Sequence, residues 1–328
     1  VPSLETPGAS VLDEYYWLNK HDPNYSLCRA TVKRGQDAHT DKKFGLDKES
    51  ALALSKLFIT SEKDLEGKKI SEVLPDSFWE TNFWLYWQTM FAFQRWSSAL
   101  EMKRYLCRYV HHIDGLPDFS ALRFTKYNQY ESLILPLMKI LEDAGIEFIY
   151  NTAVTDMDFA DGKGITVTGL HTLCDGKAGY IALQPGDKVV ATLGCMTDNA
   201  TFGDWDTPAQ LDTSYPISAT LWKNIASKKQ GLGDPDKFFS HPDKSAWMSF
   251  NCTFNGSTFM DWMEKYTHNK TGEGLSNTFV EHPWFMEIRN PTIPFFKNQT
   301  EQNPFLWMCA FNCFADGKYC GKPEYDCS

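Results

Sequence analysis

Apolar residues in the first half of the chain recur at the spacing of helices. From Phe78 to Val110 they are too dense for a helix that exposes one face, so we expect a largely buried helical segment there. Gly115, followed by Leu and Pro, ends this segment. A second periodic run covers Gln129–Ala144, and Gly145 follows it at the position of a helix C-cap.

The pattern then changes to that of strands, in which β-branched and aromatic residues alternate with polar ones. Strands are expected within 146–159, 161–173, 179–194, 284–288 and 305–311. The segment Lys188–Leu193 leads into Gly194-Cys195-Met196-Thr197, where small residues would let backbone N–H groups approach a cofactor. Many strands end at a glycine, so this ending alone indicates little.

Composition places the chain among globular proteins. Of its 328 residues, 42% are hydrophobic and 23% are charged, which argues against disorder. The length is sufficient for two ordinary domains or one large one. The aromatic share is high, at 15% with 11 Trp. Aromatic rings either pack into a core, which is the commoner arrangement, or line an apolar pocket.

Charge and cysteine usage exclude some classes of function. The net charge of −10 argues against general binding to nucleic acid, because phosphate contacts need clustered Lys and Arg, although it leaves room for a local basic patch at a membrane. Nine Cys is an odd number, which favours free thiols in a reducing, cytoplasmic compartment. The spacings are looser than those of zinc sites, so we expect no metal. The clustered cysteines are Cys309, Cys313, Cys320 and Cys327.

Membrane-spanning helices and signal peptides each have a recognisable sequence pattern. No apolar run reaches the roughly 18 residues of a membrane-spanning helix, and no signal-peptide pattern opens the sequence. Val1 is not Met and the sequence starts in the middle of a pattern, so we expect further residues before it.

Two segments carry a resemblance to a known family. Leu4–Leu27 reads LETPGASVLDEYYWLNKHDPNYSL, and Asn82–Tyr130 reads NFWLYWQTMFAFQRWSSALEMKRYLCRYVHHIDGLPDFSALRFTKYNQY. With these motifs the chain resembles the oleate hydratases, the flavoproteins once called myosin-cross-reactive antigens, which add water to a fatty-acid double bond. The resemblance is close from Val1 to Asp206, returns at PFFKNQ, and leads us to expect residues beyond Ser328 as well.

The resemblance implies an α/β fold, with a FAD-binding dinucleotide core and a largely helical, aromatic-rich substrate region. We expect a mainly helical substrate-channel region with part of the FAD core at 1–145, a strand-rich FAD-binding core at 146–240, and a divergent substrate-domain and strand segment at 241–328. The partners that it implies are an unsaturated fatty acid, a second copy of the chain in a homodimer, and a membrane surface in peripheral contact.

Hydration of an unactivated double bond needs a proton donor, removal of a proton from water, and stabilisation of the positive charge that develops between them. The proposed proton-donating Tyr of the family matches Tyr105, and its pocket Gln matches Gln129 in YNQY. Each residue has an alternative interpretation. Tyr105 could be a core tyrosine with a bonded hydroxyl, and Gln129 could cap the helix that starts near Ser132.

The cofactor match is broader. The family's FAD contacts match Val154, Leu193, Gly194, Cys195, Met196 and Thr197. The GxGxxG fingerprint, which holds a pyrophosphate at a helix N-terminus, does not occur in the sequence. In the family it precedes the part that this chain matches, as does the acidic residue thought to activate the water.

The family's substrate-binding run, Thr-x-Asn-Arg-Gln-Pro-His, matches only loosely. An alignment without a gap places Arg289, Pro291 and Phe295 where Thr, Asn and His are expected, and one gap restores Asn290 to the Asn. Phe295 removes a polar group that would hold an acid head group, whereas Arg289 could pair a carboxylate bidentately. Ser97 replaces a second family His.

We therefore expect a hydro-lyase that hydrates a cis double bond of an unsaturated fatty acid, in the manner of oleate to 10-hydroxystearate, with FAD holding the site in shape. Two alternatives stay open. One is a fatty-acid-binding flavoprotein without hydratase activity, suggested by Phe295, Pro291 and Ser97. The other is a redox flavoenzyme of amine-oxidase-like architecture. Double-bond position, stereochemistry and chain-length preference depend on the depth of the pocket, which the sequence leaves undetermined.

Overall fold

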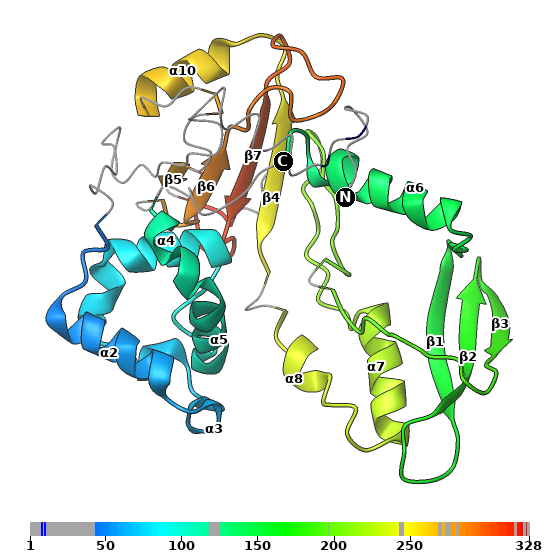
Figure 1. Ribbon diagram of the computed structural model, residues 1–328. Coiled ribbons are helices and arrows are strands. Elements are labelled where there is room, and N and C mark those ends of the chain that lie inside the picture. Colours follow the sequence, from blue (N-terminus) through cyan, green and yellow to red (C-terminus); the bar gives the residue numbers. More distant parts are fainter. Residues whose placement is uncertain are drawn as a thin grey trace. The chain divides into compact units, whose positions relative to one another are not determined.

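Figure 1 shows a computed structural model of the chain. It describes residues 8, 10, 43–117, 125–195, 197–242, 246–267, 271–272, 277–279, 282–317, 320–323 and 326. The chain forms two compact units, which we call the discontinuous unit (1–143 with 247–321) and the inserted unit (144–246 with 322–328). Both contain helices and strands, which confirms the α/β class in the sense of mixed helix and sheet. Apart from Gly8 and Ser10, the motif at Leu4–Leu27 lies outside the described residues.

Four of the described α-helices of the discontinuous unit begin at capping side chains. These four are α2 (Lys48–Ile59), α3 (Glu62–Leu65), α4 (Asn82–Phe91) and α5 (Ala99–Tyr109). The capping residues are Asp47, Ser61, Thr81 and Ser98. Each side-chain oxygen accepts an N–H of the first turn, which is worth about 1 kcal/mol because that group has no partner within the helix. Within the described part of the chain, no helix is both long and apolar enough to cross a membrane.

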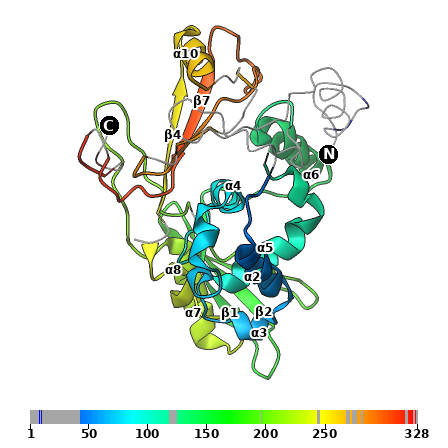
Figure 2. The same ribbon diagram turned by 90° about the vertical axis from the view of Figure 1, so that its left-hand side faces the viewer.

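The predicted buried segment Phe78–Val110 is divided into α4 and α5. Ala92, with φ 56°, adopts the left-handed conformation that ends α4. α4 is buried on nearly every side, whereas α5 buries Ala99, Met102 and Leu106 along one side. Both Figure 1 and Figure 2 place α2 next to α5. Short 3₁₀ turns connect these helices or follow them, at Ile70–Glu72, Asp76–Glu80 and Val110–Gly115.

Aromatic rings fill the core that these helices share. The rings of Phe83 and Trp87 stack with centroids 5.6 Å apart, and Trp79 meets Trp84 edge to face at 4.9 Å. Leu57 of α2 is buried in the same cluster. Rings of this size remove large apolar areas from water, so this core is the main stabilising feature of the helical part.

A four-stranded antiparallel sheet completes the discontinuous unit, in the order β4-β7-β6-β5. Its strands are β4 (Met248–Thr253), β5 (Asn277–Phe279), β6 (Met286–Arg289) and β7 (Phe305–Ala310). Helix α10 (Thr258–Thr267) follows β4. The strands predicted within 284–288 and 305–311 are confirmed as β6 and β7, except that β6 starts later, because Phe285 has φ 49°.

The helix predicted at 129–144 is present, as a π-helical turn, Tyr130–Ile134, that continues into α6 (Leu135–Asp143). Gly145 has φ 82°, which confirms its role as the C-cap residue. The inserted unit follows. It contains an antiparallel meander of β1 (Thr152–Phe159), β2 (Val167–Cys174) and β3 (Lys177–Ala182). Helix α7 (Ile217–Lys228) packs on β1, and a short helix, α8 (Asp236–Phe239), lies further along the chain.

Two of the strand predictions need correction. β1 begins at Thr152 rather than Ile146, since Asn151 has φ 52° and interrupts the extended backbone. Lys188–Leu193 forms no strand, and Val190 is 96% exposed. In the described structure this segment pairs with no strand, because β1, β2 and β3 pair only with one another. Its apolar character has another cause, since Val189 and Leu193 pack against the buried cluster of the inserted unit.

The core assignment predicts different costs for two leucines of α2. Leu57 is 2% exposed and Leu52 is 63% exposed. We expect Leu57→Ala to lower the free energy of unfolding by about 2–5 kcal/mol through lost burial and a residual cavity, and Leu52→Ala to change it by less than about 0.5 kcal/mol. Urea unfolding followed by tryptophan fluorescence measures both, because Trp79, Trp84 and Trp87 lie in the same core. Equal losses would contradict the assignment.

Candidate functional site

Two sequence motifs that are far apart in the chain are bonded to each other. The backbone N–H of Asn128 donates to the carbonyl of Phe295 at 2.8 Å, and its side-chain Nδ2 donates to the same carbonyl at 3.1 Å. The backbone N–H of Lys297 donates to Oε2 of Glu131 at 2.9 Å. We call residues 127–132 together with 295–299 the Asn128 junction. It joins the YNQY motif to the PFFKNQ motif.

Asn128 and Glu131 also start the helix that follows. Asn128 Oδ1 accepts the backbone N–H of Glu131 at 3.1 Å, and Asn128 Nδ2 donates to Glu131 Oε2 at 2.7 Å. This resembles a capping box, except that the backbone N–H of Asn128 goes to Phe295 instead of to the glutamate. Sequence reasoning missed both residues. The spacing Asn-x-x-Glu before a helical run was the signal that could have found them.

Gln129 has no role in capping. It is exposed and makes no capping hydrogen bond, so the interpretation of Gln129 as a helix cap is wrong. Buried Ser132 links the turn instead, because its hydroxyl donates to the carbonyl of Tyr127 and accepts the Tyr127 N–H, both at 3.2 Å. The helix then continues through a π-helical turn, a feature that is frequent at functional sites.

The other half of the junction is a rigid aromatic turn. The Phe295 ring stacks on Phe305, with centroids 5.3 Å apart and an interplanar angle of 6°. Gln299 Oε1 accepts the backbone N–H groups of Phe295 and Phe296, and Gln299 Nε2 donates to the carbonyl of Asn303 at 2.8 Å. Phe295 therefore presents an apolar surface at the position where the sequence resemblance predicts a polar His.

Arg289 is held by a partner that sequence reasoning missed. Its Nε and Nη2 donate to the two oxygens of Glu287 at 2.9 and 3.1 Å, and its guanidinium lies 4.6 Å from the ring centroid of Trp307. Glu287 is only 1% exposed. Residues two apart in a strand point to the same face, which was the available signal. A substrate carboxylate at Arg289 would have to share the guanidinium with this buried carboxylate.

Asn290 is buried and has an unsatisfied atom. It is 2% exposed, and its backbone carbonyl accepts the N–H of Gly272 at 3.0 Å. Its side-chain Oδ1 has no hydrogen-bond partner among the residues that the structure describes. A buried polar atom without a partner costs about 1–3 kcal/mol, and a ligand that supplies the missing bond would recover this cost.

Tyr105 lies on α5 and is partly exposed. Its ring meets those of Phe91 and Phe93 edge to face, at 5.3 and 5.2 Å. Within the described ranges its hydroxyl makes no hydrogen bond, so it is not a core tyrosine with a bonded hydroxyl. Neither a hydrogen bond nor a ring contact joins Tyr105 to Gln129 in this part of the structure.

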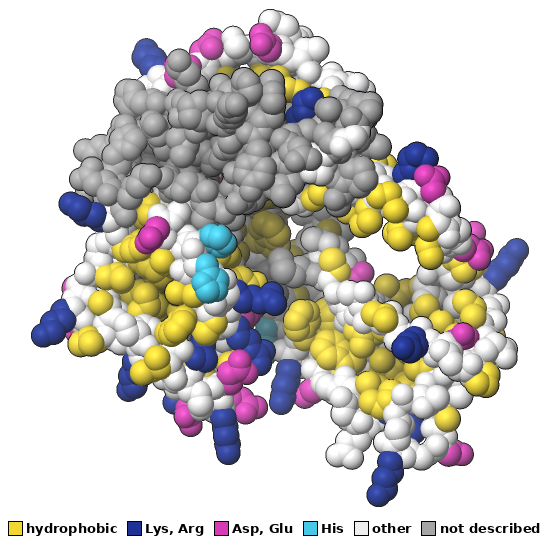
Figure 3. Space-filling view, in the orientation of Figure 1, with side chains coloured by type: hydrophobic (Ala, Val, Ile, Leu, Met, Phe, Trp, Pro, Cys, Tyr) yellow, Lys and Arg dark blue, Asp and Glu magenta, His cyan; other side chains and the backbone are white. Residues whose placement is uncertain are grey.

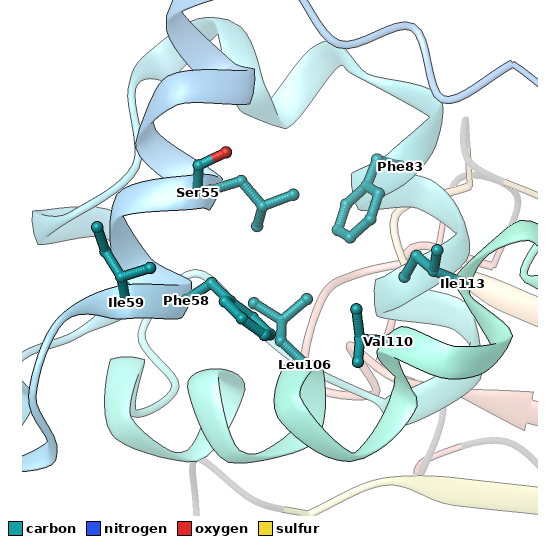
Figure 4. Close-up of a pocket in the computed structure, with 8 residues that line it drawn as sticks. Ser55, Phe58, Ile59, Phe83, Leu106, Val110 and Ile113 are labelled. Atoms are coloured by element: carbon teal, nitrogen blue, oxygen red, sulfur yellow. The ribbon is translucent and has the colours of Figure 1, made fainter.

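An apolar cavity of about 280 Å³ lies between α2, α4, α5 and the turn Val110–Gly115. The side chains of Phe83 and Ile113 face those of Ser55 and Ile59 across it (Figure 4). Figure 3 shows that hydrophobic side chains also gather on the surface of this helical part. Tyr105 does not line the cavity, although its neighbour Leu106 does, because successive helix residues point in different directions.

The residues matched to FAD lie in the inserted unit. Val154 and Leu193 pack around the buried Met157, Leu221 and Ile225. At Gly194 an added Cβ would lie 2.6 Å from Cζ of Phe239, so a larger residue would require this ring to move. Met196 lies outside the described residues.

Cys195 is exposed, and its Sγ lies 3.0 Å from the hydroxyl oxygen of Thr197. The hydrogen bond with this hydroxyl lowers the pKa of the Cys195 thiol below its usual value. In the described part of the chain no three His, Cys, Asp or Glu residues are grouped to hold a metal ion, and Cys327 lies outside that part.

Known proteins match the chain over its full length. The MCRA family matches residues 1–328. The chain is 37% identical over 336 residues to the oleate hydratase of Streptococcus pyogenes serotype M49 (strain NZ131), covering 100% of the chain and 57% of that protein. It is 30% identical over 342 residues to the linoleate hydratase of Lactiplantibacillus plantarum, covering 98% and 60%. The chain thus spans less than two thirds of the length of either relative.

The lowered pKa of Cys195 predicts that its thiolate forms, and therefore reacts, at a lower pH than an ordinary thiolate. Because the thiolate is the reactive form, we expect the midpoint of its alkylation rate against pH to lie below that of an ordinary thiol, about 8.5. Thr197→Val should move the midpoint upward. Iodoacetamide labelling with peptide mass spectrometry separates Cys195 from the exposed Cys107, Cys174 and Cys320. An unchanged midpoint in the variant would show that Thr197 is not the cause.

Proposed function

The chain belongs to the MCRA family, and from this premise we propose that it serves the FAD-dependent hydration of a cis double bond in unsaturated fatty acids. The observation that carries the proposal is the 37% identity to an oleate hydratase over the whole of this chain, which corresponds to 57% of that relative, with a linoleate hydratase as further support. The reaction class is that of a hydro-lyase. A homodimer and peripheral membrane contact are proposals that rest on the family alone, and a cytoplasmic location is proposed from the odd number of cysteines.

Tyr105 is the proposed proton donor. Its ring is held between Phe91 and Phe93, and its hydroxyl has no protein partner among the described residues that would compete for the proton. In the reaction the hydroxyl would protonate one alkene carbon, while water would attack the other carbon and lose a proton to a base. The apolar cavity beside Leu106 suits a hydrocarbon chain, but we do not assign it to the reacting double bond, because Tyr105 does not line it.

Gln129 is proposed to position the water or the substrate. Its exposed amide carries both a donor and an acceptor, and its side chain is not used for capping. The neighbouring Asn128 fixes the backbone at this point through its bonds to the Phe295 carbonyl. The amide that would contact a ligand is therefore not used for capping, while the backbone that carries it is held in place.

Asn290 is the stronger candidate for a polar contact with the fatty acid. Its buried Oδ1, which has no partner among the described residues, supports a ligand contact, whereas Arg289 could contribute only by sharing its guanidinium with Glu287. Phe295 would contribute an apolar wall, since its ring stacks on Phe305. A carboxylate head group would bind more weakly here than beside a histidine at position 295, because the phenylalanine ring offers no hydrogen bond.

FAD binding is proposed on the basis of the family alone. The described residues do not by themselves form a cradle for a pyrophosphate. Phe239 covers Gly194, and the segment that contains Val190 is not part of a sheet. Hydration involves no net redox change, so FAD would supply shape and electrostatics rather than electrons. No step of the proposed reaction is therefore assigned to it.

The test is Tyr105→Phe in the natural full-length protein. A positioned general acid contributes roughly 10²–10⁴-fold to a rate, so we expect hydroxy fatty acid formation from oleate to fall by at least about 100-fold while oleate binding is retained. Gas chromatography with mass spectrometry measures the product, and calorimetry measures the binding. Tyr180→Phe is the matched control, because Tyr180 is an exposed tyrosine of the other unit.

Two results would change the proposal. Hydration that persists in the Tyr105 variant at the wild-type rate would remove Tyr105 from the mechanism. Tight oleate binding by the wild-type protein without any product would instead support the fatty-acid-binding alternative, which the apolar Phe295 favours.

A further inference from the structure

Glu131 bridges two segments of chain with one oxygen. Its Oε2 accepts a hydrogen bond from Asn128 Nδ2 at 2.7 Å and a second from the backbone N–H of Lys297 at 2.9 Å. Positions 131 and 297 are 166 residues apart in sequence. A single carboxylate thus ties the start of the π-helical turn to the loop that follows Phe295.

The negative charge strengthens this bridge. Hydrogen bonds to an ionised carboxylate are about twice as strong as those between neutral groups. Glu131 also lies in the first turn of a helix, where the helix dipole favours an anion. A neutral acceptor of the same shape would keep the geometry but lose both contributions.

The bridge also affects the position of Gln129. The side chain of Gln129 makes no hydrogen bond to the described residues, so its position depends on the backbone that carries it. That backbone is fixed by Asn128, which donates twice to the Phe295 carbonyl. The amide of Asn128 is in turn oriented by Glu131, since Nδ2 is shared between the carboxylate and that carbonyl.

We propose that Glu131 is a positioning residue, which locks the Asn128 junction and thereby fixes Gln129 relative to the aromatic turn at Phe295. Its effect on catalysis rests on the proposed function. The lock itself does not, because it can be measured without any reaction.

Hydrogen–deuterium exchange at the Lys297 amide of the full-length protein reports on the lock. In Glu131→Ala this amide loses its acceptor, and we expect exchange to be roughly tenfold faster, as for the loss of a hydrogen bond to a charged group. Glu131→Gln keeps an acceptor without charge and should give an intermediate rate. Glu142→Ala is the control, because Glu142 is exposed on α6. In this variant the Lys297 amide should exchange at the wild-type rate.

The amides of Met102 and Leu106 in α5 separate a local effect from a loss of folding. They should keep their wild-type exchange in all three variants. Should Glu131→Ala fail to fold, Glu131→Gln carries the test. The proposal would be overturned if the Lys297 amide exchanged at the same rate in the folded Glu131 variants as in Glu142→Ala.

Kinetics test the consequence for Gln129. Loss of position without loss of a contact to the substrate should lower kcat by roughly tenfold and change KM by less than about twofold, with Glu131→Gln recovering part of the loss. An unchanged kcat alongside faster exchange would overturn the positioning role. Absence of hydration in the wild type would instead count against the proposed function, while the exchange result would still decide whether the lock exists.

Discussion

Helix α4 has to be covered on every side, and the discontinuous unit is built around that requirement. Its 10 residues bury Phe83, Trp84 and Trp87 together with most of their neighbours, so no face of the helix can be left to water. Polar residues at its edges fix its place against the sheet. Thr89 lies 3.5 Å from the hydroxyl of Thr278 on β5, and Gln94 reaches a backbone carbonyl near the end of β7 at the same distance.

Around this apolar centre, buried polar groups are mostly held in pairs. The buried Glu287 is satisfied by Arg289, and the partly exposed groups of the Asn128 junction likewise share donors and acceptors between two motifs. A buried charge without a partner would cost several kcal/mol, so such pairing is the condition for keeping polar chemistry inside the unit. Asn290 departs from this rule, because its Oδ1 has no partner among the described residues, and this makes it an informative atom for the proposed substrate contact.

The sequence predicted what local rules determine. Gly145 as a helix end and the strand at Phe305 followed from periodicity and glycine chemistry alone. Lys188–Leu193 was misassigned because pairing and exposure are set by partners elsewhere in the chain. In the site, the Asn-x-x-Glu spacing of the junction is local and can be recognised in the sequence. The Phe295 carbonyl that completes the junction is 167 residues away from Asn128, so local rules do not predict it. The proposed roles of Tyr105 and Gln129 came from the family resemblance, because an exposed tyrosine or glutamine has no distinctive local pattern.

The division into units has a consequence for the order in which the polypeptide acquires its structure. The meander β1–β3 and α7 lie within one continuous stretch, 144–246, and their contacts are available as soon as that stretch has left the ribosome. The Asn128 junction must wait until residue 299 has been made, and the sheet around β7 until residue 310 has been made. Closing such long loops is entropically slow. During that interval the large rings of α4 would have only the helical half of their cover. The nascent chain would then expose these apolar rings, which favours aggregation, while its middle is already folded.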